Sequence, residues 1–157
     1  MHVSDPEARN LRSKERFVEA VTLERTLTEL DHVRLLNLLR RDVRGDGSPQ
    51  HVRAIEDVLD ASSLVPSREV GPDVVTMYSQ VLLQDAQTGQ RNTLTLCYPA
   101  DAEPAVGFVS VLSPVGSSLL GLRVGCVARW STPAGDEKAA EILAILFQPE
   151  SSGDYAT

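Results

Sequence analysis

The sequence has little cysteine, few aromatic side chains and no long apolar run. Its two cysteines, Cys97 and Cys126, are far apart, and neither belongs to a CxxC pair. We interpret them as two reduced, buried thiols of a cytoplasmic protein, with a disulfide or metal role as the less favoured alternative. The apolar runs fall far short of the ~20 residues that cross a bilayer, and the first residues lack the apolar region of a secretory signal. We expect no membrane contact.

Positive charge is also scarce. The chain has 15 lysines and arginines against 22 acidic residues, which gives a net charge of −7. This balance argues against binding nucleic acid through its phosphates, and we expect no direct sequence-specific contact with nucleic acid. From Asp73 onward, nine acidic residues face four basic ones, Arg91, Arg123, Arg129 and Lys138. A large partner of this half should offer a basic or apolar face, which favours another protein.

Motifs that carry catalysis or bind cofactors are missing. The stretch GSSLLG at 116–121 lacks both the GxGxxG spacing and the GK[ST] ending of phosphate-binding loops. Ser117 and Ser118 do not lie in a GxSxG elbow. The three histidines, His2, His32 and His51, form neither an HExxH motif nor a pair with cysteine at metal spacing. We therefore expect no enzyme, no cofactor and no metal.

Two amphipathic segments predict a pair of antiparallel helices. The first begins at Thr28, where TELD resembles a capping box in which Thr28 accepts from the Asp31 amide and Asp31 reaches back. Its apolar stripe consists of Leu30, Val33, Leu36, Leu39 and Val43, widened by Leu35 and Leu38. RGDG at 44–47 ends this helix, and Ser48-Pro49 begins the second, with an inward face of Val52, Ile55, Val58 and Leu59. With about 13 residues, each arm would be only ~20 Å long.

The pattern changes to that of strands after a Pro- and Gly-rich linker at 64–73. We predict strands at 79–84, 92–98, 108–112, 125–130 and 140–147, the first two joined by a turn at Gly89. Thr93 and Thr95 alternate with Leu94 and Leu96, which suggests a sheet with one wet face. The tail from Gln148 is polar and is expected to be ordered only in part. The predicted fold class is α+β: a short helical hairpin and a small antiparallel sheet with one short helix.

The short helix follows the strand at 108–112 in the stretch SVLSPVGSSLLGLRVG. Ser113 is a plausible N-cap, Pro114 its first helical residue, and Gly121 a left-handed exit. Leu119, Leu120 and Leu122 are expected to close the core. The corner formed by Leu112, Ser113 and Pro114, rigid and near the surface, is left as a candidate contact site.

Several motifs resemble one known family. SPVGSSLLGLRVG, followed by WSTPAGD and FQPESSGDY, is similar to the C-terminal domain of the Gre transcript-cleavage factors. PDVVTMYSQVLLQD, LCYPADAE, QPESSGDY and RTLTELDHVRLLNLL resemble the Rnk-type subgroup, the regulators of nucleoside diphosphate kinase. The resemblance covers about residues 25–155. It implies a coiled-coil hairpin over 25–64, a linker over 65–72 and an FKBP-like domain over 73–157, after a flexible or additional segment at 1–24.

The resemblance also implies a role. Gre factors dock on RNA polymerase near its secondary channel, and acidic residues at the hairpin tip help to hold a catalytic magnesium ion of the polymerase. The tip here is RRDVRGDGSPQ, in which Asp42 and Asp46 lie among arginines that include Arg44. Because Gre arms are roughly twice as long as the ~20 Å expected here, this tip should not reach the polymerase active centre. The resemblance therefore implies a non-enzymatic regulator that competes with Gre factors.

The polymerase contact of Gre factors maps onto the corner at Ser113 and Pro114, while Leu112 stands where some Gre proteins have Asp or Asn. Two alternatives remain: a true transcript-cleavage factor, and a protein-binding module for a nucleoside diphosphate kinase, whose regulation could also be indirect. Prolyl isomerase activity is disfavoured, because the domain's few aromatic residues are scattered along the chain.

Overall fold

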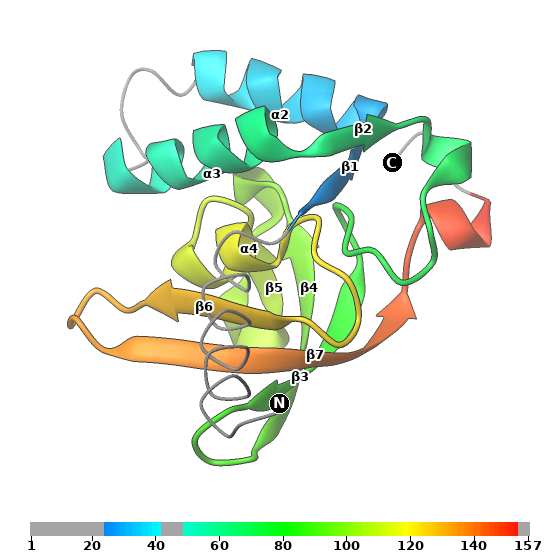
Figure 1. The fold of residues 1–157 in the computed structure, drawn as a ribbon. Helices are drawn as coiled ribbons and strands as arrows, with labels where there is room; N and C mark the ends of the chain where they lie inside the picture. Colours follow the sequence, from blue (N-terminus) through cyan, green and yellow to red (C-terminus); the bar gives the residue numbers. More distant parts are fainter. Residues whose placement is uncertain (1–23, 42–48, 154–157) are drawn as a thin grey trace, which may run out of the picture.

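Two helices framed by two short strands come first in the computed structural model, which describes residues 24–41 and 49–153. Strand β1 (Thr26–Thr28) leads into helix α2 (Glu29–Arg41), and helix α3 (Pro49–Ala61) leads into strand β2 (Ser63–Val65). The strands pair in parallel, and the helices run side by side in opposite directions (Figure 1). Each helix has 13 residues, which corresponds to about 20 Å.

Helix α2 begins where the sequence predicts, but its buried face differs from the predicted stripe. The Thr28 hydroxyl accepts from the Asp31 amide at 3.0 Å, which confirms the N-cap. The Asp31 carboxylate does not reach back; it accepts from the Met77 amide at 3.1 Å. Leu35 is fully buried while Val33 is 53% exposed, so the prediction that Val33 faces the core was wrong. A buried aspartate at the start of the helix turns Leu35 inward, and a count of apolar residues alone misses it.

The sheet has five strands in the order β5-β4-β3-β7-β6. All five lie where alternating apolar residues predicted them: β3 (Gln80–Asp85), β4 (Arg91–Cys97), β5 (Phe108–Ser110), β6 (Val127–Ser131) and β7 (Glu137–Phe147). The pairs β3–β4, β3–β7 and β6–β7 are antiparallel. Strands β4 and β5 pair in parallel, so the prediction of an entirely antiparallel sheet was wrong.

The connection between β4 and β5 explains this parallel pair. Two short 3-10 helices, η3 (Pro99–Asp101) and η4 (Pro104–Val106), carry the chain back toward the start of β4. Gly107 then turns the chain with a φ of +89°, and its carbonyl accepts from the Thr95 amide at 2.7 Å. Such a return is required because parallel neighbours cannot be joined by a tight hairpin.

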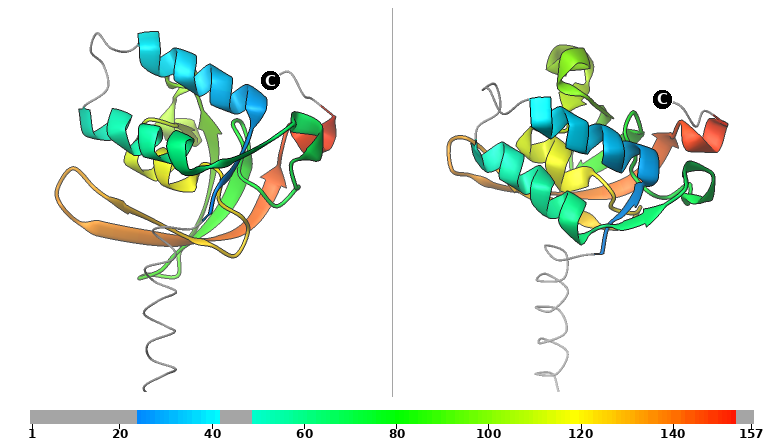
Figure 2. Two further views of the ribbon diagram at one scale, coloured as in Figure 1. Left: turned by 45° about the horizontal axis from the view of Figure 1, so that its top comes forward. Right: turned by 90° about the horizontal axis from the view of Figure 1, so that it is seen from above.

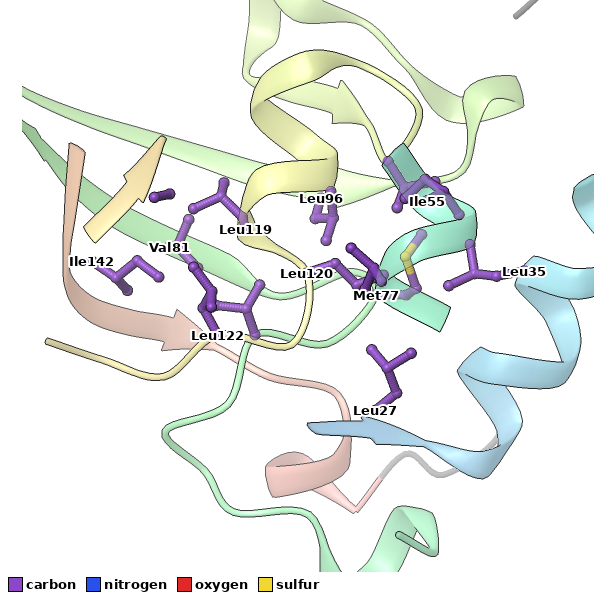
Figure 3. Close-up of a cluster of buried hydrophobic side chains, with 14 of the residues drawn as sticks. Leu27, Leu35, Ile55, Met77, Val81, Leu96, Leu119, Leu120, Leu122 and Ile142 are labelled. Carbon is purple, nitrogen blue, oxygen red and sulfur yellow. The ribbon is translucent and has the colours of Figure 1, made fainter. Parts of the chain in front are cut away.

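One apolar core joins the helices to the sheet. Helix α4 (Pro114–Leu119) lies between α2 and α3 on one side and the sheet on the other (Figures 1 and 2). Leu119, Leu120 and Leu122 are at most 1% exposed, which confirms their predicted place in the core. The core cluster draws on every layer, as Figure 3 shows: it includes Leu27, Leu35, Ile55, Met77, Val81, Leu96, Leu119, Leu120, Leu122 and Ile142. The helical pair is therefore packed along the sheet domain.

The start of the C-terminal segment is buried although its sequence is polar. After β7, Gln148 and Glu150 are 3% and 8% exposed, and the 3-10 helix η5 (Glu150–Ser152) follows. The Gln148 side-chain amide donates to the carbonyls of Gly71 and Val74 at 2.9 and 2.7 Å. These bonds attach the end of the chain to the segment that enters the sheet, a segment that also contains the 3-10 helix η2 (Ser67–Glu69).

Candidate functional site

The predicted contact corner lies where β5 passes into α4. The Ser113 hydroxyl accepts from the Gly116 amide at 3.1 Å, and it donates to the Ser110 carbonyl at 2.6 Å. Pro114 occupies the first turn of α4, where its missing N–H costs no helical hydrogen bond. The predicted N-cap and helix start are both confirmed. The corner is rigid because its polar groups are bonded to one another.

The three predicted contact residues differ in accessibility. Leu112 is only 8% exposed and belongs to the core, whereas Ser113 and Pro114 are half-buried. The Leu112 amide is bonded to the Ser110 hydroxyl at 3.0 Å, which fixes the backbone just before the helix. A partner at this corner would therefore meet mainly Pro114 and the outer side of Ser113.

Gly116 explains how α4 approaches β5 so closely. A Cβ atom built on Gly116 would lie 2.0 Å from the carbonyl oxygen of Ser110 and 3.0 Å from the Val111 Cα. No L side chain fits in this space without moving the backbone. The geometry of the corner thus depends on the absence of a side chain at this position.

The predicted residues of the hairpin tip, Asp42, Arg44 and Asp46, lie outside the described residues. The structure does show where the two arms stop and start again, with α2 ending at Arg41 and α3 beginning at Pro49.

A buried polar junction, which the sequence analysis did not single out, connects α2 to the domain. Asp31 is 1% exposed; its Oδ2 atom accepts from the Met77 amide, and its Oδ1 atom has no hydrogen-bond partner in the structure. The Thr76 hydroxyl lies 2.7 Å from Oε1 of Glu150, to which it donates, and 2.9 Å from the Ser79 hydroxyl. In the sequence, this junction is marked only by Asp31 in TELD and Glu150 in QPES. Nothing in the sequence predicts that these two distant residues lie close together.

Burial governs the electrostatics of this junction. Loss of solvation raises the pKa of Asp31 to about 7, and the nearby charge of Glu150 contributes in the same direction. The Met77 amide and the Thr28 hydroxyl act in the opposite direction, because they favour the ionised form. Strongly shifted pKa values such as this one cluster at functional sites, and they also occur in structural networks.

Arg25 holds β1 against the end of α4. Its Nη1 atom donates to the carbonyls of Ser117, Ser118 and Leu120 at 3.2, 3.2 and 2.8 Å. These are carbonyls at the C-terminal end of a short helix, where a cation is favourable. Arg25 thereby supplies donors to carbonyls that the helix cannot satisfy itself, and it ties the helical pair to the corner's own helix.

Tyr78 has the left-handed backbone conformation that is uncommon for residues other than glycine, with a φ of +65°. Its ring packs at 5.7 Å from that of Tyr98, and its hydroxyl donates to the Asp101 carboxylate. Burial, assisted by this hydrogen bond and the Asp101 charge, raises the pKa of Tyr78 to about 12. The hydroxyl therefore stays protonated and serves to anchor the loop after β4.

Catalytic groups do not converge within the part of the chain that the structure describes. No group of three or more His, Cys, Asp and Glu residues there could hold a metal ion. Cys97 and Cys126 are free thiols, and burial raises the pKa of Cys97, which keeps it in the unreactive thiol form. A groove of about 540 Å³ is lined by Glu29, Leu30, Val33, Pro66, Ser67 and Arg68, but it is widely open and contains none of the predicted site residues.

Comparison with known proteins identifies the family. The family model described as "Transcription elongation factor, GreA/GreB, C-term" matches residues 70–147. The regulator of nucleoside diphosphate kinase of Escherichia coli (strain K12) is 39% identical over 102 residues, which cover 65% of this chain and 75% of that protein. The chain belongs to the Rnk-type family of the Gre-factor superfamily.

Other relatives of this Rnk-type chain are Gre factors themselves. Transcription elongation factor GreA of Geobacillus kaustophilus is 31% identical over 94 residues, which cover 60% of this chain but only 59% of GreA. A GreA/GreB structure from Nitrosomonas europaea superimposes with a TM-score of 0.66 at 31% identity, covering 79% of this chain and all of that one. These relatives support a transcription-associated regulatory role for the Rnk-type chain. Within the described residues, no helix is long and apolar enough to cross a membrane.

Proposed function

We propose that this Rnk-type chain is a non-enzymatic regulator that binds RNA polymerase near its secondary channel and competes there with Gre factors. The observation that carries the proposal is the packing of the two arms. Leu35 and Ile55, one from each arm, are fully buried in the same cluster as Leu96 and Leu119 of the sheet domain. Arms anchored in this way cannot project as a free coiled coil.

Arm length supports the same conclusion. Each arm has 13 helical residues, so it extends for about 20 Å even along its full length. Bound through the corner, the chain would occupy the rim of the channel without bringing Asp42 and Asp46 to the active centre. We therefore do not expect the chain to stimulate transcript cleavage. By occupying the rim of the channel, it would prevent the longer Gre factors from binding there.

The corner is the proposed contact because it is both rigid and half-exposed. Its internal hydrogen bonds, from Ser113 to Ser110 and from Gly116 to Ser113, mean that binding would require little ordering of the backbone. The acidic balance of the sheet half favours a partner face that is basic or apolar. Pro114, at the start of α4, is the residue best placed to meet such a face.

The proposed contact is tested by placing a positive charge at the corner. Pro114→Lys should weaken the affinity for core RNA polymerase at least ~10-fold, because the charge is desolvated in the contact and repels a basic face. Pro133→Lys makes the same change in the exposed turn between β6 and β7 and should leave the affinity unchanged. The assay is equilibrium binding, with circular dichroism to verify that both variants fold.

Equal affinities for the wild type and Pro114→Lys would exclude the corner as the contact. If wild-type protein stimulated RNA cleavage, the rim model would fail and the alternative of a cleavage factor would replace it. The name of the 39% identical relative favours one second candidate, a direct protein-binding module for nucleoside diphosphate kinase. Co-purification with that kinase in the absence of polymerase would support it.

A further inference from the structure

The buried junction of Asp31 and Glu150 lies between three segments that are distant in the sequence. Asp31 is in the first turn of α2, Thr76 and Met77 precede β3, and Glu150 begins η5. Both carboxyl groups are on residues less than 10% exposed, and both bond to the same short segment, Asp31 to the Met77 amide and Glu150 to the Thr76 hydroxyl. The helical pair and the C-terminal segment therefore share one polar attachment to the domain, formed by two acidic side chains, in addition to the contacts of the apolar core and of Arg25.

The donors at this junction are too few for two ionised carboxylates. Thr76 supplies one hydroxyl and Met77 one amide, and the Thr28 hydroxyl also favours the ionised form of Asp31, while Oδ1 of Asp31 is buried without a hydrogen-bond partner. A buried, ionised oxygen without a donor is strongly unfavourable, whereas a protonated one carries no charge to stabilise. The geometry alone therefore favours a proton on Asp31 in the folded molecule.

The other charged and titratable groups around Asp31 do not compensate for the cost of burying its ionised form. Arg34, one turn further along α2, acts on Asp31 only as the weakest of the influences on it. Tyr98, at the end of β4, faces the same junction, where burial and the charge of Asp31 raise its pKa and keep it neutral. Glu150 of η5 adds charge of the same sign. Within residues 24–41 and 49–153, Arg34 is the cation whose charge acts on Asp31, and burial outweighs its influence.

We propose that Asp31 is a pH-sensitive switch for the attachment of α2: its neutral form seats the helix against the 73–79 segment beside Glu150, and loss of its proton to solvent loosens α2. This inference goes beyond the proposed binding to polymerase and does not depend on it. It assigns a regulatory role to the attachment of the helical pair, whose placement the rim model requires.

The direction of the effect follows from proton linkage. In the open form, Asp31 has the ordinary aspartate value near 4, while the pKa in the closed form is about 7. The closed form therefore holds more protons between these values, and its stability falls as pH rises through this window and levels off above it. Opening of α2 should increase by up to about ten-fold for each pH unit between 5 and 7.

Amide hydrogen exchange of the full chain tests the switch. Protection of residues 29–41, corrected for the intrinsic pH dependence of exchange, should fall by ten-fold or more from pH 5 to pH 7 relative to residues 137–147 of β7. Asp31→Asn, which keeps the acceptor for the Met77 amide but cannot ionise, should abolish this fall. Glu29→Gln removes an exposed acidic group from the same helical turn and should retain it.

A second measurement tests the proposal even if the Asp31→Asn variant does not fold. The carboxyl carbon of Asp31 in the wild-type chain, followed by NMR, should titrate near 7, and Glu150→Gln should move this midpoint to lower pH. Titration near 4, or the same pH dependence in the wild type and Asp31→Asn, would overturn the proposal. An unchanged midpoint in Glu150→Gln would remove Glu150 from the switch.

Discussion

At the scale of single residues, the geometry of the corner between β5 and α4 depends on Gly116, which has no side chain. Gly116→Ala should destabilise the protein by about 2 kcal/mol or more, because its Cβ would overlap the Ser110 carbonyl oxygen at 2.0 Å and force the backbone apart. Urea unfolding measures the loss. Ser118→Ala in the same helix removes only a hydroxyl bonded to Val115 and should cost less than about 1 kcal/mol. Equal effects of the two variants would show that the close approach of α4 to β5 is not required.

The cap of α2 is a second test at this scale. Thr28→Val keeps the buried shape but removes the oxygen that accepts from the Asp31 amide, so it should cost about 1 kcal/mol of unfolding free energy. Thr28→Ser retains the oxygen and should recover most of this loss apart from its missing methyl group. Thermal or urea denaturation distinguishes them, and a Ser variant that is less stable than the Val variant would argue against the cap.

Residue patterns predicted some of these features and missed others. Ser113 and Pro114 carry a local signal for a helix start, and the structure confirms it because the cap closes within four residues. The inward orientation of Asp31 could not be predicted, since its acceptor role depends on Met77, which is distant along the chain. Val33 was misplaced for the same reason: tertiary packing sets the rotation of α2, and helical periodicity does not.

At the scale of elements, β1 and α4 are joined by Arg25. Arg25→Met keeps the aliphatic stem but leaves the carbonyls of Ser117, Ser118 and Leu120 without this donor, and it should cost about 2–3 kcal/mol. Arg123→Met is the control, because the Arg123–Asp73 pair is about half exposed at 3.4 Å and should contribute less than about 1 kcal/mol. Urea denaturation of both variants measures the two losses of unfolding free energy. A smaller effect at Arg25 than at Arg123 would contradict the role of Arg25.

The elements themselves were predicted well and their pairing less well. Alternating residues located all five strands, because each strand has its own apolar face. The sequence analysis did not predict that β4 and β5 pair in parallel. A hairpin reverses the chain once and gives antiparallel strands, whereas the connection here contains two 3-10 helices and reverses the chain twice. The polar tail was expected to be ordered only in part; what its sequence could not predict is that the Gln148 side chain donates to two carbonyls of a segment more than seventy residues away.

At the scale of the whole molecule, the helices and the sheet share one core, so they should unfold together. We expect far-ultraviolet circular dichroism and the fluorescence of Trp130, on β6, to show a single coincident transition. Leu35→Ala should lower the free energy of unfolding by about 2–5 kcal/mol, and both probes should report the same loss although the substitution lies in α2. Loss of helix before the change at Trp130 would indicate that the helical pair is a separate unit.

The central claim is that the chain occupies the polymerase rim and excludes longer Gre factors. The most direct measurement is equilibrium binding of the wild-type chain to core RNA polymerase with a Gre factor added as competitor. The account predicts mutually exclusive binding, with the Gre factor displacing the chain in proportion to its concentration, and no stimulation of RNA cleavage by the chain. Absence of binding at micromolar concentration, or simultaneous binding of both proteins, would contradict it.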